Sequence, residues 1–291
     1  MSIPFEKIHP DTTLGLVALV VPSLPRALKF YRDVIGLQVH TQDGENVWMG
    51  ALGGRSILQL AENAKLPGPG SLSRRTTGLF HFAILVPSRR ELARTLQHLN
   101  ESGWPVQGAA DHLVSEAVYL SDPDGNGIEI YRDLPRSAWP THNGQLQMAT
   151  DPLDIAGVMA ELDDNIAPWT GMHPDTVLGH IHLRVSEIAA AEAFYSRLLG
   201  FDLMLRYGTS ASFVSAGGYH HHVAFNTWGS AGAPPPPPNA NGLRYFTIYL
   251  ANQAELERLV ARLRQAGLPL SVQAGGFLGH DPSGNGILFT A

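Results

Sequence analysis

The sequence predicts an α+β fold of four βαβββ modules, arranged as two tandem copies of a pair. First, "HPDTTLGLVALVV" (9–21) matches "HPDTVLGHIHLRV" (173–185), and "FYRDVIGLQV" (30–39) matches "FYSRLLGFDL" (194–203) at the same offset, so the chain is duplicated. Second, each copy contains the same order of elements twice. Third, three strand-type segments follow each helix, which excludes the alternating βα pattern of a doubly wound sheet and favours mixed or antiparallel sheets.

Module one begins with the β-rich run 14–21, which Pro22 ends. The segment 23–36 places Leu24, Ala27, Leu28 and Tyr31 at helical spacing and stops at Gly36, so we expect a helix there. Short β-type segments follow at 38–42, 46–52 and 56–62. Module two repeats this order: a strand at 80–87, a helix at 88–103, and strands at 106–114, 116–122 and 127–132.

The second copy provides modules three and four. "GLFHFAIL" (78–85) matches "GLRYFTIY" (242–249), and "LSDPDGNGIEIYRD" (120–133) matches the ending "GHDPSGNGILFTA" (279–291). The predicted organisation is therefore one domain at 1–133, an ordered linker at 134–172 with one short helical candidate, "DIAGVMAELDD" (154–164), and a second domain at 173–291. The run "GSAGAPPPPPNANG" (229–242) is interpreted as an extended spacer; a docking ligand for a domain that binds polyproline helices is the alternative.

The composition limits the classes of function. The chain of 291 residues has a formal net charge of −6, which argues against nucleic acid or an anionic membrane as the main partner. It contains no cysteine, so disulfides, thiolate metal sites and a cysteine nucleophile are excluded. The N-terminal "MSIPFEKIHPD" lacks the apolar region of a signal peptide, and the apolar runs are too short to span a membrane. We therefore expect a cytoplasmic protein.

Comparison of the copies points to a metal site. His81 corresponds to Tyr245, Glu129 to Leu288, and His180 to Leu16, so three metal-type side chains stand where the counterparts are apolar or aromatic. Two imidazoles and one carboxylate are the facial triad of non-haem Fe(II) oxygenases, and three protein ligands leave open positions for a substrate and O₂.

Other assignments remain open at this point. His180 and His182 alternate in "GHIHLRV", so they share one face of a strand, and either could be a ligand or part of a polar face. "DPDGNGIEIYRD" (122–133) also fits the start of a calcium-binding EF-hand loop. Pro123 and the β-type run that follows oppose the helices of an EF-hand, so a Gly/Asn/Asp turn between strands is the preferred interpretation.

The modules and this residue pattern resemble the vicinal oxygen chelate superfamily, and within it the two-domain extradiol dioxygenases of the catechol 2,3-dioxygenase type. The most specific part is "ADHLVSEAVYLSDPDGNGIE" (110–129). It is similar to the extradiol signature at His112, Val118–Tyr119, Asp122–Pro123, Gly125 and Glu129, and it departs from the signature at Ala110. The resemblance covers nearly the whole chain and implies a glyoxalase/bleomycin-resistance/extradiol dioxygenase fold with open mixed-sheet cups.

Carried over by position, the resemblance implies that Glu129 and His81 are metal ligands and that Tyr119 and His112 contact the substrate or dioxygen. It assigns an acid–base role to His221 in "YHHHVAF" (219–225), with His220 and His222 as competing choices. Familiar extradiol enzymes take all three ligands from modules three and four. Here a complete set requires modules two and three to act together, with His180 as the third ligand and His182 as its neighbour.

The implied reaction is Fe(II)- and O₂-dependent extradiol cleavage of a small catechol-type aromatic to a muconic semialdehyde, with Mn(II) as the alternative metal. The expected catalytic residues are His221, His112 and Tyr119. The same fold also supports glyoxalase-like isomerases or lyases and metal-free proteins that bind aromatic drugs, and both stay as alternatives. A homo-oligomer is compatible with the sequence, which does not specify the state.

Overall fold

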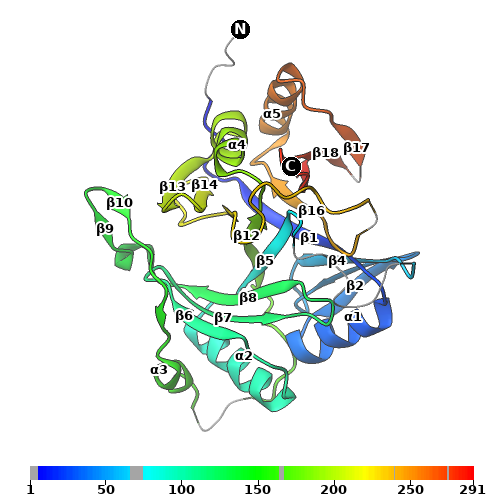
Figure 1. Cartoon of the computed structure of the whole chain (residues 1–291). Helices are drawn as coiled ribbons and strands as arrows, with labels where there is room; N and C mark the ends of the chain where they lie inside the picture. Colours follow the sequence, from blue (N-terminus) through cyan, green and yellow to red (C-terminus); the bar gives the residue numbers. More distant parts are fainter. Residues whose placement is uncertain (1–5, 66–74, 164–166, 239, 274) are drawn as a thin grey trace. The chain divides into compact units, whose positions relative to one another are not determined.

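The computed structural model describes residues 6–65, 75–163, 167–238, 240–273 and 275–291 (Figure 1). The chain divides into two compact units. One comprises Met1–Ala18, Leu72–Phe80 and Gly179–Ala291, and the other comprises Leu19–Ser71 and His81–Leu178. The four modules follow one another along the chain in the predicted order, each with a strand, a helix and three strands. The predicted α+β class is confirmed.

Module one ends its helix differently from the prediction. The α-helical part stops at Phe30, and the chain continues as a π-helical turn to Ile35 before Gly36 closes it with φ 88°. Only a glycine adopts such a left-handed conformation without strain, so the predicted stop at Gly36 is correct. The elements of this module are β1 (Thr13–Val21), α1 (Leu24–Phe30), η1 (Tyr31–Ile35), β2 (Gln38–Asp43), β3 (Asn46–Gly50) and β4 (Ser56–Glu62).

Module two follows the sequence pattern closely. Its helix begins after Ser88, whose side chain accepts a hydrogen bond from the Glu91 N–H (3.2 Å), and ends at Gly103. The helix lies along the strands of its module in Figure 1, and its buried residues are Leu92, Ala93, Thr95 and Leu99. The elements are β5 (Gly78–Leu85), α2 (Arg89–Ser102), β6 (Gly108–Asp111), β7 (Ser115–Ser121) and β8 (Gly127–Asp133).

The segment after module two is ordered in its described part, as predicted. Its short strand β11 pairs antiparallel with β6, with Asp151 opposite Asp111. The helical candidate forms only over Ile155–Met159, where the Asp154 side chain caps the Gly157 N–H, and residues 164–166 lie outside the described residues. The elements are η2 (Arg136–Ala138), β9 (Thr141–His142), β10 (Gln145–Leu146), β11 (Asp151–Pro152) and α3 (Ile155–Met159).

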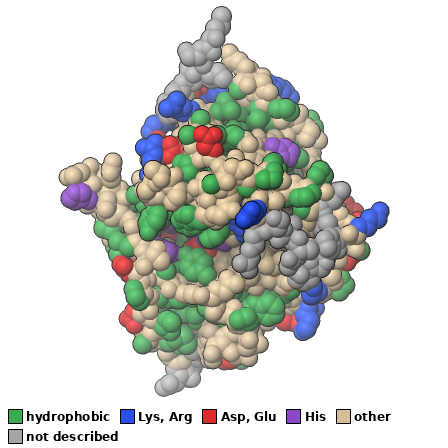
Figure 2. Space-filling view, in the orientation of Figure 1, with side chains coloured by type: hydrophobic (Ala, Val, Ile, Leu, Met, Phe, Trp, Pro, Cys, Tyr) green, Lys and Arg blue, Asp and Glu red, His purple; other side chains and the backbone are tan. Residues whose placement is uncertain are grey.

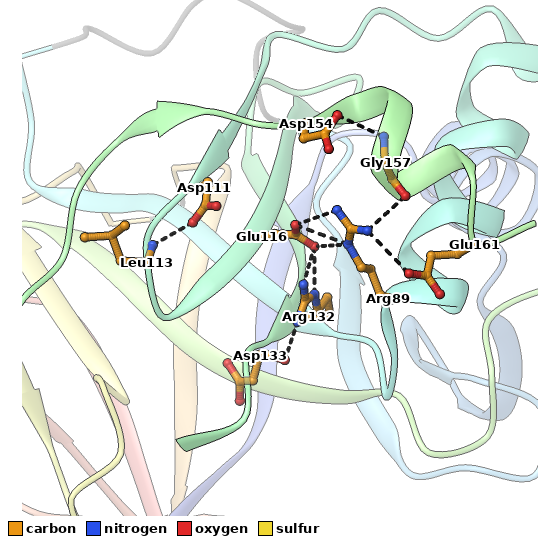
Figure 3. A network of polar contacts seen from close by, with 9 residues as sticks. All are labelled: Arg89, Asp111, Leu113, Glu116, Arg132, Asp133, Asp154, Gly157 and Glu161. Atoms are coloured by element: carbon orange, nitrogen blue, oxygen red, sulfur yellow. Dashed lines mark hydrogen bonds and ion pairs between the residues drawn. The ribbon is translucent and has the colours of Figure 1, made fainter. Parts of the chain in front are cut away.

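A network of ion pairs ties this segment to module two (Figure 3). Arg89, the first residue of α2, binds the buried carboxylate of Glu116 and donates to the Gly157 carbonyl of α3 (Nη1–O 2.9 Å). Arg132 on β8 binds the same carboxylate (Nε–Oε2 2.8 Å). The single carboxylate of Glu116 therefore joins a helix, a strand and the linker.

Modules three and four repeat the order, with a second π-helical turn at the end of the module-three helix. The run between them has no helix or strand in its described part, and Thr77 donates its N–H to the Pro234 carbonyl (3.1 Å), which agrees with a spacer. The elements are β12 (Val177–Arg184), α4 (Ile188–Glu192), η3 (Ala193–Leu198), β13 (Asp202–Tyr207), β14 (Ala211–Ser215), β15 (Val223–Asn226), β16 (Gly242–Tyr249), α5 (Gln253–Gln265), β17 (Ser271–Gln273), β18 (Gly276–His280) and β19 (Gly286–Thr290).

Two large mixed sheets contain these strands. One has the order β17-β18-β19-β16-β1-β4-β3-β2, and the other the order β11-β6-β7-β8-β5-β12-β15-β14-β13. In modules two and three the first and last strands pair in parallel, β5 with β8 and β12 with β15. The hairpin strands pair antiparallel, β7 with β8 and β14 with β15.

Two general properties of the chain follow from the helices and the surface. None of the helices in the described ranges is long and apolar enough to cross a membrane. On the face drawn in Figure 2, basic and acidic side chains are scattered among apolar and polar ones. The division into domains 1–133 and 173–291 stays a prediction.

Candidate metal centre

Two of the predicted ligands lie on adjacent parallel strands. β5 and β8 pair so that His81 is opposite Gly127 and Ala83 is opposite Glu129. Side chains two residues apart on paired strands point to the same face, and His81 Nε2 lies 3.1 Å from Glu129 Oε2. Glu129 is only 2% exposed. An ionised carboxylate buried this deeply needs a compensating charge, which a cation would supply.

His180 completes a set of three donors. It lies on β12 and is 1% exposed. His81, Glu129 and His180 each offer one ligand atom, and these three atoms all lie within 4.8 Å of one another. Among the residues that the structure describes, this is the His/Asp/Glu group that could hold a metal ion. Two imidazole nitrogens and one carboxylate oxygen fit a divalent iron or manganese ion, since both accept mixed nitrogen and oxygen donors.

Tyr119 and His112 form a chain of polar contacts that begins beside Glu129. Tyr119 on β7 lies directly opposite Glu129 on β8, and burial together with the charge and hydrogen bond of this carboxylate raises the pKa of Tyr119 well above its usual value. The Tyr119 hydroxyl is 2.5 Å from His112 Nε2, and His112 Nδ1 is 2.6 Å from the Ala149 carbonyl oxygen. A carbonyl only accepts, so His112 donates from Nδ1–H. The single Tyr119 hydroxyl proton then has two acceptors close by, the Glu129 carboxylate and His112 Nε2.

The three consecutive histidines have different surroundings. They precede β15 rather than lying within it. The His221 ring lies 4.1 Å from that of His180, and His221 Nδ1 is 2.8 Å from His220 Nδ1. His222 accepts at Nδ1 from the Ala216 backbone N–H (3.2 Å), and this hydrogen bond fixes the orientation of its ring. The His221 ring is nearer to that of His180 than the His220 ring is (6.0 Å), and the acid–base role of His221 stays a prediction.

His182 shares the strand of His180 but has its own partners. Its Nε2 is 2.9 Å from the Asn226 amide nitrogen, and its ring packs at 4.9 Å from the ring of Phe80 and 5.6 Å from that of Trp228. It is not a member of the three-residue group described above. An aromatic environment of this kind favours a packing role over a ligand role.

The counterpart positions, which lie in modules one and four, form an apolar cluster. Ala18, Tyr245 and Leu288 are buried together, and Leu16 and Leu278 pack against them. These include the counterparts of all three candidate ligands. The pattern of substitutions between the copies therefore describes one polar group and one hydrophobic group at equivalent places in the repeat.

Sequence reasoning missed the neighbours that orient the candidate residues. The Ala149 carbonyl, which fixes the proton on His112, belongs to the linker, and a backbone acceptor leaves no trace in residue type. Asn226 beside His182 is visible in the sequence, but nothing in its spacing links it to that histidine.

Comparisons with known proteins identify the family to which the chain is similar. The model of the Glyoxalase/Bleomycin resistance protein/Dioxygenase superfamily matches residues 13–130 and 177–289. The chain is 46% identical over 286 residues to a catechol-2,3-dioxygenase of Bacillus subtilis (strain 168), covering 97% of this chain and 98% of the relative. It is 21% identical to a manganese-dependent 2,3-dihydroxybiphenyl 1,2-dioxygenase of Geobacillus genomosp. 3, covering 89% and 75%.

Solved structures show the same fold. A putative dioxygenase from Bacillus subtilis superposes with a TM-score of 0.65 at 12% identity, covering 98% of this chain and 86% of the other. Glyoxalase I from Zea mays gives a TM-score of 0.55 at 15% identity, covering 96% and 92%.

Proposed function

The chain belongs to the glyoxalase/bleomycin resistance protein/dioxygenase superfamily, and from that premise we propose that it is an extradiol dioxygenase. It cleaves the ring of a small catechol-type aromatic with O₂, giving a muconic semialdehyde. The proposed ligands of its Fe(II) ion are His81, Glu129 and His180. The observation that carries the proposal is the buried group of two histidines and one glutamate, whose ligand atoms lie within 4.8 Å of one another. The relative of 46% identity carries the name catechol-2,3-dioxygenase.

The donor set favours this chemistry over a glyoxalase-like isomerase. Three protein ligands leave room for both a bidentate substrate and O₂. Glyoxalase-type sites usually add a second carboxylate, whereas the neighbouring side chains here are histidines and aromatic rings. A metal-free binding protein would have no use for a buried carboxylate beside two imidazoles.

Residues around the proposed metal supply proton transfer and orientation. A bound Fe(II) would act as a Lewis acid on the catechol oxygens and bring substrate and O₂ together. His221, whose ring lies 4.1 Å from that of His180, would take a proton from a substrate hydroxyl. Tyr119 lies beside Glu129 and His112, and its hydroxyl would stabilise charge that develops on a substrate oxygen when its proton turns from these two acceptors to the substrate.

Replacing Glu129 with Gln tests the proposal. The carboxamide keeps the shape but removes the charge, so the variant is expected to lose metal binding and at least 100-fold of catechol-dependent O₂ uptake. Metal content is measured after anaerobic loading of the metal-free protein with Fe(II), and ring cleavage is followed by the absorbance of the semialdehyde. Glu101→Gln, which changes an exposed carboxylate on α2, is the matched control and should behave as wild type.

Three outcomes would contradict parts of the proposal. If Glu129→Gln kept wild-type activity, the assignment of Glu129 as a metal ligand would be wrong. A wild-type protein that binds no iron and still binds catechols would support the resistance-type alternative, and turnover without O₂ uptake would support the isomerase. Loading the same metal-free protein with Fe(II) or Mn(II) in parallel decides which ion supports turnover; iron is the proposed ion, although one relative is named as manganese-dependent.

A further inference from the structure

The two D-P-x-G-N-G turns have the same internal bonding. Asp122 accepts from the backbone N–H groups of Asp124 (2.9 Å) and Asn126 (2.8 Å), and from the Asn126 side chain (2.7 Å). Asp281 accepts from the equivalent groups of Ser283 (2.8 Å) and Asn285 (2.9 Å for both bonds). Both carboxylates are buried, at 4% and 5% exposed. Each turn is therefore closed around one aspartate.

In each copy, a tyrosine from the preceding module gives that aspartate a fourth donor. The Tyr31 hydroxyl donates to Asp122 Oδ2 (2.8 Å), and the Tyr195 hydroxyl donates to Asp281 Oδ2 (3.0 Å). Both tyrosines are fully buried and lie in the π-helical turns η1 and η3. The end of the helix in one module thus holds the turn of the next.

The strands that leave the two turns carry different residues. β8 begins at Gly127, directly after the Asp122 turn, and Glu129 lies two residues further, 3.1 Å from His81. β19 begins at Gly286 after the Asp281 turn and carries Leu288 into the apolar cluster. The same tyrosine–aspartate contact therefore fixes a candidate metal ligand in one copy and a hydrophobic residue in the other.

The copy with Glu129 has a second contact to the turn. Arg26 on α1 forms an ion pair with Asp124 of the Asp122 turn. The equivalent positions in the second copy are Ala190 and Ser283, which offer no charge. There the turn is held by hydrogen bonds instead, from the Ser186 N–H to Ser283 Oγ (3.0 Å) and from the Thr77 hydroxyl to the Ser283 carbonyl (2.7 Å). Helix α1 and the turn η1 thus hold the turn before β8 at two points.

We propose that module one, which provides none of the three candidate ligands, is a positioning element for the metal: α1 and η1 hold the Asp122 turn, and Tyr31 acts through it as a positioning residue for Glu129. This inference rests on the proposed role of Glu129 as a ligand. A metal site tolerates displacements of only about 0.5 Å in its ligands. Loss of the Tyr31 hydroxyl lets β8 shift far enough to lower the affinity for the metal ion without unfolding module two.

Tyr31→Phe and Tyr195→Phe form a matched pair of variants. Each removes one buried hydroxyl donated to an equivalent aspartate, so thermal unfolding of the metal-free full chain should shift by a similar amount in both. Mn²⁺ affinity, measured from the free-ion electron paramagnetic resonance signal, is expected to fall about 3- to 10-fold in Tyr31→Phe, below the 10- to 100-fold typical of residues that contact a ligand directly. In Tyr195→Phe it should change less than twofold.

Arg26→Gln provides a second route if Tyr31→Phe does not fold. The Arg26 side chain is partly exposed, so its loss is tolerated, and Mn²⁺ affinity should fall about two- to fivefold on the same reasoning. Lys29→Gln, on the same helix and paired only with exposed Asp33, is the control. Equal Mn²⁺ affinities of the two tyrosine variants, or of the two helix variants, would overturn the inference.

Glu129→Gln in the same Mn²⁺ assay separates this inference from the proposed function. If Glu129→Gln loses Mn²⁺ but Tyr31→Phe and Arg26→Gln do not, only the positioning role fails. If Glu129→Gln binds Mn²⁺ as the wild type does, the ligand assignment is wrong, and the positioning role fails with it.

Discussion

Tyr119 occupies a position where two neighbours constrain one hydroxyl group. Its oxygen lies 2.5 Å from His112 Nε2, while Glu129 lies opposite on β8. The Ala149 carbonyl keeps the His112 proton on Nδ1, so Nε2 presents a lone pair to the tyrosine. The phenol therefore stays protonated and donates, as the raised pKa of Tyr119 also indicates.

We expect Tyr119→Phe to separate metal binding from turnover. The proposed ligands are unchanged, so Mn²⁺ affinity should stay within about threefold of wild type, whereas kcat/KM for a catechol should fall about 10- to 100-fold through loss of one oriented donor. Anaerobic Mn²⁺ titration and steady-state O₂ uptake measure the two quantities. His112→Phe should show the same separation of metal binding from turnover. If kcat/KM is unchanged in either variant, the substituted residue has no role in the reaction.

At the scale of single residues, the sequence predicted which residues are candidates for the site better than it predicted the contacts that those residues make. Comparison of the two copies was enough to select His81, Glu129 and His180, because metal-type residues replaced apolar ones at three equivalent positions. It could not separate His221 from His220 and His222, since adjacent residues share one local pattern. Their distinct contacts arise only from the loop that folds before β15.

The helices show which features of an element the sequence pattern predicts and which it does not. The repeated order of elements predicted a helix over 88–103, and α2 buries Leu92, Ala93 and Leu99 on its hydrophobic face. The helical spacing of apolar residues in 23–36 cannot show that the last turn is π-helical, because a single wider turn changes that spacing little. The helix predicted over 154–164 forms only in its first part, where Asp154 provides a cap.

Glu116 is the centre of the element-scale network in Figure 3. Burial alone would raise the pKa of its carboxyl group, but the bidentate contact with Arg89 and the contact with Arg132 hold the pKa below its usual value. A carboxyl group with a depressed pKa stabilises the fold above its unfolded pKa, and this contribution is lost as the pH falls through the folded value. The network therefore stabilises module two and the linker at neutral pH.

We expect Glu116→Gln to lower the free energy of unfolding by about 2–4 kcal/mol at pH 7, because two arginines lose a buried partner. The difference from wild type should shrink as the pH falls through the lowered pKa of the wild-type Glu116 carboxyl group, where the carboxylate protonates. Urea unfolding at several pH values measures both effects. Glu255→Gln removes an exposed i,i+3 pair with Arg258 and should cost less than about 0.5 kcal/mol; an equal cost in the two variants would contradict the assigned role.

Across the whole molecule, the duplicated scaffold is conserved between the copies while the chemistry is not. The repeat of strand, helix and three strands, the π-helical turns and the tyrosine–aspartate contacts occur in both copies. The polar group His81, Glu129 and His180 has the apolar counterparts Tyr245, Leu288 and Leu16. The sequence predicted this asymmetry because a duplication supplies its own internal comparison. Strand order across modules needed the structure, since no local pattern records it.

The asymmetry predicts one metal ion per chain. Wild-type protein should bind one equivalent of Mn²⁺, and Leu288→Glu should not add a second, because Leu16 and Tyr245 provide no imidazole beside the new carboxylate. The free energy of unfolding of Leu288→Glu should instead be lower than that of wild type by about 2–4 kcal/mol at pH 7, because an unpaired carboxyl group enters an apolar cluster. Leu288→Met keeps the volume and should cost less than about 1.5 kcal/mol. Metal analysis and urea unfolding test both statements, and two equivalents in wild type, or equal stabilities of the two variants, would contradict the assignment of this cluster as purely structural.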